Sequence, residues 1–466
     1  MKSGKQIGGI EWYALAFGLF LGLTIWKFGN PVILDQKIFP PHSLSEFWND
    51  PWPTHWANWI LLPLAMIGTF LVFAKRPRPL ESKWLWLLPC LWFGWQLFAA
   101  TRTVDASLTT ATLWEFFGCD ACFFLGAFVL GHERARHWLL AGVLAAFTCC
   151  LVKAIDQHVF EFPQNRQLLV EGERTGWSNI PPEIFLEMKR EHVVIPTNGV
   201  DVANPAILAK FAKGRVYGTL VYPNALAGMI LLLFPLSLVL VFERTKRLRP
   251  AIRALVIALA LFLGSAGFFW TGSKLGWLIA IAMSGLWLFR LKWPARLKWV
   301  VFAVIVLMGL GIFAVRFHNY FVAGATSVGA RFDYWRAAAQ TARAHPLLGT
   351  GPGTFQRPYA QLKAPDAEMA RLTHNDYLEQ FSDSGIAGGI FYAAWIFLAL
   401  TLIGRRSSLS SDPVTFALFT GVLGWFAQGL GEFSLYIPAL AWTAFTLLGC
   451  LLTPPRNQID TPREIN

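Results

Sequence analysis

Four basic side chains from separate parts of the chain are candidates for binding an anion at a membrane surface. Arg215 and Arg331 lie in or beside long polar segments, while Lys274 and His374 each precede an apolar run. An arginine guanidinium stays protonated, and its planar fork binds phosphate oxygens through two hydrogen bonds. Two arginines at one membrane interface are therefore suited to a pyrophosphate at the head of a lipid. The alternative is that each arginine only extends to the interface or pairs with an acid such as Asp333.

His374 is a candidate general base. Thr373 and Asp376 match a capping box, which predicts that His374 lies in the first turn of a helix. The positive end of the helix dipole disfavours imidazolium and attracts anions, so the ring stays neutral. A neutral imidazole beside a phosphate leaving group is the arrangement that a general base uses. A purely structural histidine is the alternative.

A stripe of polar side chains follows His374 on the same predicted helix. Its members are spaced at i, i+3, i+4 and i+7 and share one face: Asp376, Glu379, Gln380 and Asp383. Such a face suits sugar hydroxyls or a metal ion, or it faces the water of a loop. No partner set of His and Asp at ligand spacing occurs elsewhere, so the sequence does not favour a metal site.

The elements that must position these residues are membrane helices. The chain is 55% hydrophobic with a mean hydropathy of +0.45, which is more apolar than a soluble domain. Apolar runs of ~20 residues, long enough to cross a bilayer as a helix, recur along it. The 22 tryptophans fit this class, because amphipathic rings favour the bilayer interfaces. These features predict a polytopic membrane protein.

The net charge of +12 does not indicate nucleic-acid binding. Basic residues cluster in short turns between the apolar runs, for example from Lys75 to Lys83 and from Arg244 to Arg253. Positively charged turns lie on the cytoplasmic side of a membrane, so this charge is a topology signal. The six cysteines lie in or beside apolar runs, which favours small buried side chains over a redox or metal motif.

The apolar runs predict an all-α polytopic fold of about 12 transmembrane helices with two long periplasmic loops. Five helices fall in residues 1–152, four in 218–316 and three in 374–453. Loop 153–217 contains one short predicted helix, and loop 317–373 is the predicted catalytic loop. Alternation of the basic turns puts Lys2, Lys5 and the tail 454–466 in the cytoplasm. The predicted spans are 12–26, 57–74, 84–100, 108–130, 138–152, 218–242, 251–269, 275–290, 298–316, 384–403, 413–430 and 434–453.

Several ordered blocks within residues 215–400 resemble the bacterial O-antigen ligase and polymerase superfamily. The upstream blocks are Arg215-x-x-Gly218, Pro223-Asn224-x-x-Ala227 and Thr271-Gly272-Ser273-Lys274. The downstream blocks are Arg331-x-x-x-Trp335, His345-Pro346-Leu347-Leu348-Gly349-x-Gly351-x-Gly353-x-Phe355, His374-Asn375-Asp376-Tyr377-Leu378 and Gly385-Ile386-Ala387-Gly388. The pairing of the glycine-rich block with the block at His374 is the specific part of the match.

The resemblance implies a membrane-embedded glycosyltransferase of GT-C-like fold that needs no metal ion or other cofactor. Such enzymes move a glycan from undecaprenyl pyrophosphate to an acceptor on the periplasmic side of the bacterial inner membrane. The resemblance makes Arg215 and Arg331 ligands of the pyrophosphate, and His374 the base or orienting donor beside the reacting sugar. Lys274 stands where the family usually has arginine. Further substrate-binding candidates are Asn224, Trp335, Asn375, Asp376 and Tyr377.

The implied partners are a carrier-linked glycan donor, membrane lipids and a glycan acceptor, with no nucleic acid. Lipid A-core, the acceptor of an O-antigen ligase, is the prediction. A polymerase that extends glycans on the carrier and a protein O-oligosaccharyltransferase share this chemistry and stay open, because acceptor choice is assigned to loops 28–56 and 153–213. A lipid-linked sugar transporter is a different class. Transporters place charges near the bilayer midplane, whereas the candidate charges here lie at outer helix ends, which favours catalysis at the interface.

Overall fold

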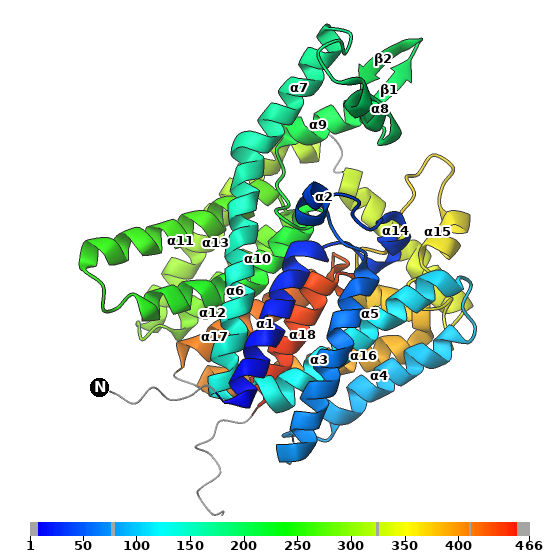
Figure 1. The fold of residues 1–466 in the computed structure, drawn as a ribbon. Coiled ribbons are helices and arrows are strands. Elements are labelled where there is room, and N and C mark those ends of the chain that lie inside the picture. The colour runs from blue at the N-terminus through cyan, green and yellow to red at the C-terminus, as the bar shows by residue number, and fades with distance from the viewer. Residues whose placement is uncertain (1–7, 76–79, 323–325, 410–411, 454–466) are drawn as a thin grey trace, which may run out of the picture.

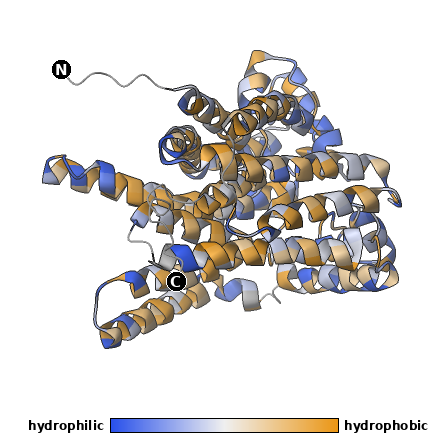
Figure 2. Ribbon diagram, turned by 90° about the horizontal axis from the view of Figure 1, so that it is seen from below, coloured by the Kyte–Doolittle hydropathy of each residue, from blue (hydrophilic) through white to orange (hydrophobic). Residues whose placement is uncertain are grey.

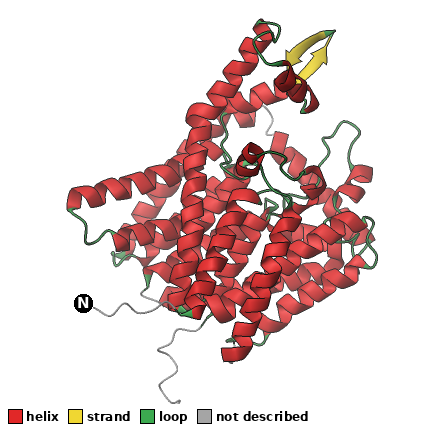
Figure 3. Cartoon of the chain, viewed as in Figure 1, coloured by secondary structure: helices red, strands yellow, loops and turns green. Residues whose placement is uncertain are grey.

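The computed structural model describes residues 8–75, 80–322, 326–409 and 412–453. The predicted tail 454–466 and the basic residues Lys2, Lys5, Arg76 and Arg78 lie outside the described residues. The regular secondary structure of the described residues is helical apart from one two-stranded hairpin (Figures 1 and 3).

Each predicted span coincides with a helix. Within the described residues, eight helices are long and apolar enough to cross a membrane, and three shorter apolar helices accompany them. Figure 2 shows hydrophobic residues along most of the length of these helices. The protein is thus an all-α polytopic membrane protein, while the predicted number of crossings stays a prediction. The helices at the predicted spans are those eleven and α12, with these bounds: α1 (Gly9–Lys27), α3 (Thr54–Lys75), α4 (Trp84–Ala100), α5 (Ala106–Leu125), α6 (Glu133–Asp156), α10 (Pro223–Arg244), α11 (Pro250–Thr271), α12 (Lys274–Arg290), α13 (Ala295–Val322), α16 (Asp376–Leu409), α17 (Pro413–Gln428) and α18 (Pro438–Leu452).

Local sequence explains where several of these helices begin. Proline occupies the first position of α10, α11, α17 and α18, where its missing N–H has no helical partner to lose. Between α11 and α12, Gly272 adopts a left-handed φ of 59°, and the Ser273 side chain then caps α12. This tight turn places the carbonyl of Thr271 and the side chain of Lys274 next to each other in the chain.

The core is built around α18, in which every residue from Pro438 to Leu452 is buried. Helices α1, α5 and α17 pack against it. Helices α1 and α6 approach closely, because a Cβ on Gly18 would meet the Leu139 carbonyl and one on Gly142 would meet the Gly18 backbone. This rigid interior holds the ends of α16, α17 and α18, where the polar residues gather.

The segment 153–217 is more structured than the single short helix predicted for it. Helix α6 continues through a π-helical turn (Gln157–Glu161) into α7 (Phe162–Arg174). Helices α8 (Pro182–Arg190) and α9 (Pro205–Lys213) and the antiparallel strands β1 (Val194–Thr197) and β2 (Val200–Ala203) follow. Trp177, Ile180 and Val194 belong to a small core of their own. The unit projects from one end of the helical body (Figure 1).

The second predicted loop, 317–373, also contains helices. Helix α13 extends to Val322, and α14 (Thr326–Ala344) and α15 (Gln356–Leu362) follow it. Tyr334, Phe355 and Tyr359 form part of a second small core that holds α14 against α15. Short helices complete the structure: α2 (Leu44–Asn49), the 3-10 turns η1 (Val32–Lys37) and η4 (Ser434–Tyr436), and the π-turn η2 (Gly126–Leu130).

Candidate active site

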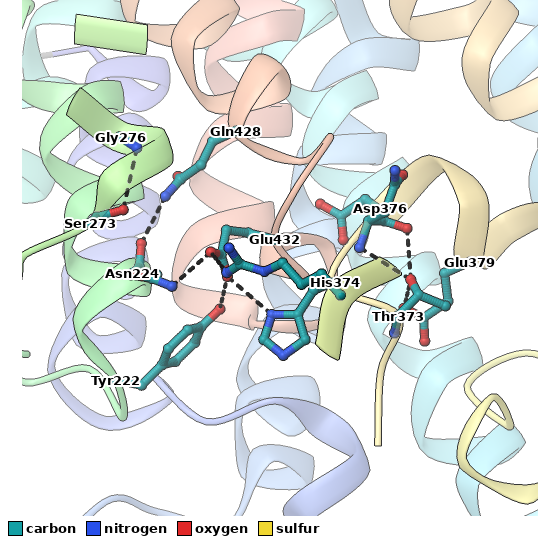
Figure 4. Close-up of polar contacts among 12 residues, drawn as sticks. Tyr222, Asn224, Ser273, Gly276, Thr373, His374, Asp376, Glu379, Gln428 and Glu432 are labelled. Atoms are coloured by element: carbon teal, nitrogen blue, oxygen red, sulfur yellow. Dashed lines mark hydrogen bonds and ion pairs between the residues drawn. The ribbon is translucent and has the colours of Figure 1, made fainter. Parts of the chain in front are cut away.

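The carboxylate of Glu432, in the turn between α17 and α18, joins the basic and polar candidates into one cluster (Figure 4). Its side chain is 1% exposed. Oε1 accepts hydrogen bonds from Nη2 of Arg331 and, at 2.7 Å, from Nδ2 of Asn224. Oε2 accepts from the Tyr222 hydroxyl at 3.3 Å and lies 3.4 Å from Nδ1 of His374. Residues more than 200 positions apart thus meet at a single buried acid.

Arg215 reaches the same cluster through Asn224. Its Nη2 donates to Oδ1 of Asn224 at 2.9 Å, and its Nε donates to the Thr271 carbonyl at 2.7 Å. Burial lowers the pKa of the Arg215 guanidinium, and the charge of Glu432 opposes this effect. An arginine pKa is high enough for the side chain to stay protonated in a protein. Arg215 is therefore a fixed cation whose orientation the protein has already set.

Two further cations surround this group. Lys274, the first residue of α12, lies close enough to Arg215 and Arg331 for their charges to interact. Its Nζ lies over the Tyr320 ring, 3.8 Å from the centroid. The charge of Arg316, near the end of α13, also acts on Arg215 and Lys274. Four cations near one buried carboxylate make a region that attracts a polyanion such as pyrophosphate.

His374 lies outside helix α16, so the predicted capping box is wrong. The helix begins at Asp376, and its cap is Asn375, whose Oδ1 accepts from the N–H of Leu378 at 2.9 Å. The Thr373 hydroxyl is not available as a cap because it bonds to Glu379 and to the backbone of Asn375. His374 itself adopts a left-handed φ of 53°. Its ring packs edge-on against Phe433, with centroids 4.7 Å apart.

Four other predicted substrate-binding residues make their contacts away from the Glu432 carboxylate. Asp376 is buried, and its carboxylate accepts from the N–H of Leu435. The Tyr377 hydroxyl donates to the Phe426 carbonyl at 3.2 Å. Trp335 packs against Phe332 on α14, with ring centroids 5.4 Å apart. Asn375 acts as a helix cap. Of the six predicted substrate-binding residues, Asn224 and Lys274 are therefore the two that join the cationic group.

Comparison with known protein families gives one match. Residues 259–393, from α11 to α16, match the family described as O-Antigen ligase. This match supports the assignment of the chain to the O-antigen ligase superfamily. No curated protein matches the chain. The chain is therefore a membrane glycan enzyme of ligase or polymerase type. The matched segment contains Lys274, Arg331 and His374, whereas Arg215, Asn224 and Glu432 lie outside it and are joined to it by the contacts above.

An open apolar groove lies beside the cluster. It has a volume of about 1280 Å³ and runs between α10, α11, α12 and α13. Phe269, Trp270 and Trp277 line it. Trp270 precedes Thr271, the backbone partner of Arg215, and Trp277 follows Lys274 by one helical turn. The groove thus approaches the cationic group from the apolar side.

The polar stripe on α16 faces the protein interior and not loop water. Asp376, Glu379, Gln380 and Asp383 are each at most 2% exposed. Oδ2 of Asp383 accepts from the N–H of Gly353 at 2.7 Å, which ties the glycine-rich turn to α16. No group of three or more His, Cys, Asp and Glu side chains suited to a metal ion occurs in the described part of the chain. Asp383 therefore supports the glycine-rich turn, whereas Gln380 accepts from Trp92 and Gln96 of α4.

Glu432, Tyr222 and Arg316 are the site residues that the sequence analysis missed. A signal for Glu432 existed, because it is an acid between two apolar segments that end at Gln428 and begin at Pro438. An ionisable group at a membrane helix end is a functional candidate in its own right. Tyr222 and Arg316 carry no comparable signal, since tyrosine and arginine are both common at helix ends near a membrane interface.

Proposed function

We propose that this protein is an O-antigen ligase of the bacterial inner membrane. It transfers a glycan from undecaprenyl pyrophosphate to lipid A-core on the periplasmic face. The observation that carries the proposal is the convergence of Arg215, Arg331 and His374 on Glu432 beside the apolar groove. A polyprenyl chain suits the groove, and its pyrophosphate suits the cations at the groove's end.

The donor's leaving group is the centre of the proposed chemistry. Arg331 is held by Glu432, and Arg215 by Thr271 and Asn224, so both guanidinium groups are oriented before a donor arrives. Preorganised cations stabilise charge as it develops, without the cost of reorganising at the moment of reaction. As the bond from the anomeric carbon to the pyrophosphate oxygen breaks, the electron pair leaves with the pyrophosphate. Charge stabilisation by arginine in this scheme requires no metal ion.

His374 is the proposed base for the acceptor. Its Nδ1 faces the Glu432 carboxylate at 3.4 Å, so an Nδ1–H tautomer donates to Glu432 and leaves Nε2 as an acceptor. The acceptor hydroxyl oxygen bonds to the anomeric carbon, and its proton goes to Nε2. A carboxylate on the far side of the ring stabilises the imidazolium that forms. Glu432 thereby serves the base and the phosphate-binding arginine together.

The test is a single-turnover transfer assay with the purified protein and a glycan on undecaprenyl pyrophosphate. Lipid A-core and a second carrier-linked glycan are offered together as competing acceptors, with and without EDTA. We expect glycan on lipid A-core, in equal yield with EDTA. Extension of the carrier-linked chain would make the protein a polymerase instead. Transfer to neither acceptor would contradict the ligase proposal and turn attention to a protein acceptor or to transport.

Arg331→Lys is expected to lower transfer about 10- to 100-fold although the charge is kept. One ammonium group cannot reproduce the planar fork that bonds Glu432 and a phosphate oxygen at once. Donor titration with each variant separates the loss of donor affinity from the loss of turnover. The matched control is Arg336→Lys, because Arg336 is an exposed residue of the same helix. If Arg331→Lys transferred glycan at the wild-type rate, Arg331 would not need to bond Glu432 and a phosphate oxygen at the same time.

A further inference from the structure

The backbone around His374 is held in an uncommon conformation. A residue with a Cβ atom disfavours a φ of 53°, so its surroundings must hold it there. The backbone conformation decides where the imidazole points. The contacts that hold Thr373 and Asn375, the neighbours of His374, are therefore contacts that aim the proposed base.

Those contacts end at one side chain, Glu379 of α16 (Figure 4). Its Oε2 accepts from the N–H of Thr373 at 3.0 Å and lies 2.9 Å from the Thr373 hydroxyl oxygen, whose one hydrogen has the Asn375 carbonyl as a second acceptor at 2.9 Å. The same hydroxyl oxygen accepts from the N–H of Asn375 at 3.1 Å. Asn375 then caps the helix that carries Glu379. The chain of hydrogen bonds runs from Glu379 around His374 and back to α16.

The contact between Glu379 and Thr373 is fully buried. Glu379 and Thr373 are both 0% exposed. Oε1 of Glu379 has no hydrogen-bond partner among the described residues. A carboxyl group in such a place costs stability, and an apolar side chain would not. Among the described residues no hydrogen bond joins Glu379 to Glu432, and the hydrogen-bonded connection from Glu379 toward His374 is Thr373.

We propose that Glu379 is a positioning residue for His374 and acts through the Thr373 hydroxyl and N–H. The inference rests on the proposed function, because it needs His374 to act in glycan transfer. A displacement of about 1 Å in a reacting group lowers a rate by as much as about 100-fold. Loss of either partner therefore lowers turnover and leaves donor binding, which depends on the arginines, in place.

The test compares two substitutions at Thr373. If packing matters, Thr373→Val should be the more active variant, and if the hydroxyl matters, Thr373→Ser should be. Thr373→Ser keeps the hydroxyl and loses the methyl group, whereas Thr373→Val keeps the shape and loses the hydroxyl. We expect Thr373→Ser to stay near wild type in kcat and Thr373→Val to fall about 10- to 100-fold, with KM for the donor unchanged in both. A Thr373→Val variant as active as Thr373→Ser would overturn the proposal.

Glu379 itself is tested in parallel. Glu379→Ala should lower kcat as much as Thr373→Val does, and Glu379→Gln should lose less because it keeps an acceptor oxygen. The control is Glu115→Ala, since Glu115 is an equally buried glutamate on α5 whose carboxyl oxygens have no partner among the described residues. If Glu379→Ala fails to fold, the Thr373 pair decides the matter.

A double substitution shows whether Glu379 acts through His374 or independently of it. When combined with His374→Ala, Glu379→Ala should lower the residual transfer no further, because the group that it positions is gone. A further loss of equal size in the double variant would show that Glu379 acts independently. Failure of the proposed function would appear as a wild-type protein that transfers nothing, whereas failure of this inference leaves wild-type transfer intact.

Discussion

His374→Ala is expected to lower glycan transfer about 100- to 10,000-fold, the range that a positioned base contributes. The acceptor hydroxyl is a weak nucleophile until its proton has a place to go. Donor binding should stay within about threefold of wild type, because Arg215 and Arg331 keep their partners Thr271, Asn224 and Glu432. Single-turnover rates and donor titration measure the two effects separately.

His374→Asn distinguishes a base from an orienting donor. The amide can still donate a hydrogen bond toward Glu432 but cannot take up a proton at neutral pH. If His374 is the base, His374→Asn is as inactive as His374→Ala. Substantial activity in His374→Asn would assign an orienting role. His137→Ala is the control, because His137 is exposed at the far end of α6.

Glu432→Ala is expected to lower transfer about 100- to 1000-fold and to reduce thermal stability. Removing one partner of a fully buried ion pair costs about 3–5 kcal/mol, and the loss here should be smaller because the Arg331 side chain is 19% exposed. Arg331 would lose its carboxylate partner, Nδ2 of Asn224 would lose its acceptor, and His374 would lose the carboxylate facing Nδ1. Turnover, donor affinity and thermal unfolding of the detergent-solubilised protein are the measurements.

Donor affinity separates Glu432 from His374. Glu432→Ala should weaken donor binding because it releases the phosphate-binding arginine, whereas His374→Ala should not. Glu368→Ala supplies the control, because Glu368 is an exposed acid in the loop between α15 and His374. A Glu432→Ala variant with normal donor affinity and normal turnover would contradict the central role of this carboxylate.

Several features of the fold and the site were predictable because their causes are local. A run of ~20 apolar residues is stable as a membrane helix whatever lies around it. The three candidates Arg215, Arg331 and His374 were found because polar residues at the ends of such runs are conspicuous. Asn224 joined them through the family resemblance, and the structure places it between Arg215 and Glu432.

Other features depended on packing that no local pattern encodes. The stripe beginning at Asp376 has the spacing of a solvated face, yet its members are buried against neighbouring segments. The predicted cap Thr373 instead accepts from the N–H of Asn375 and contacts the buried carboxylate of Glu379, while Asn375 caps α16. Both outcomes have the same source, since the partner of each polar group comes from elsewhere in the fold.

The sequence by itself determined that the protein is an α-helical membrane protein, and it named the cations and the histidine that are candidates for its chemistry, because hydropathy and charge are properties of neighbouring residues. The tertiary structure decided that these residues meet at Glu432. That carboxylate bonds to groups 58, 101 and 208 positions away along the chain. A hydrogen bond acts over about 3 Å, so contacts of this kind exist only once the helices have packed.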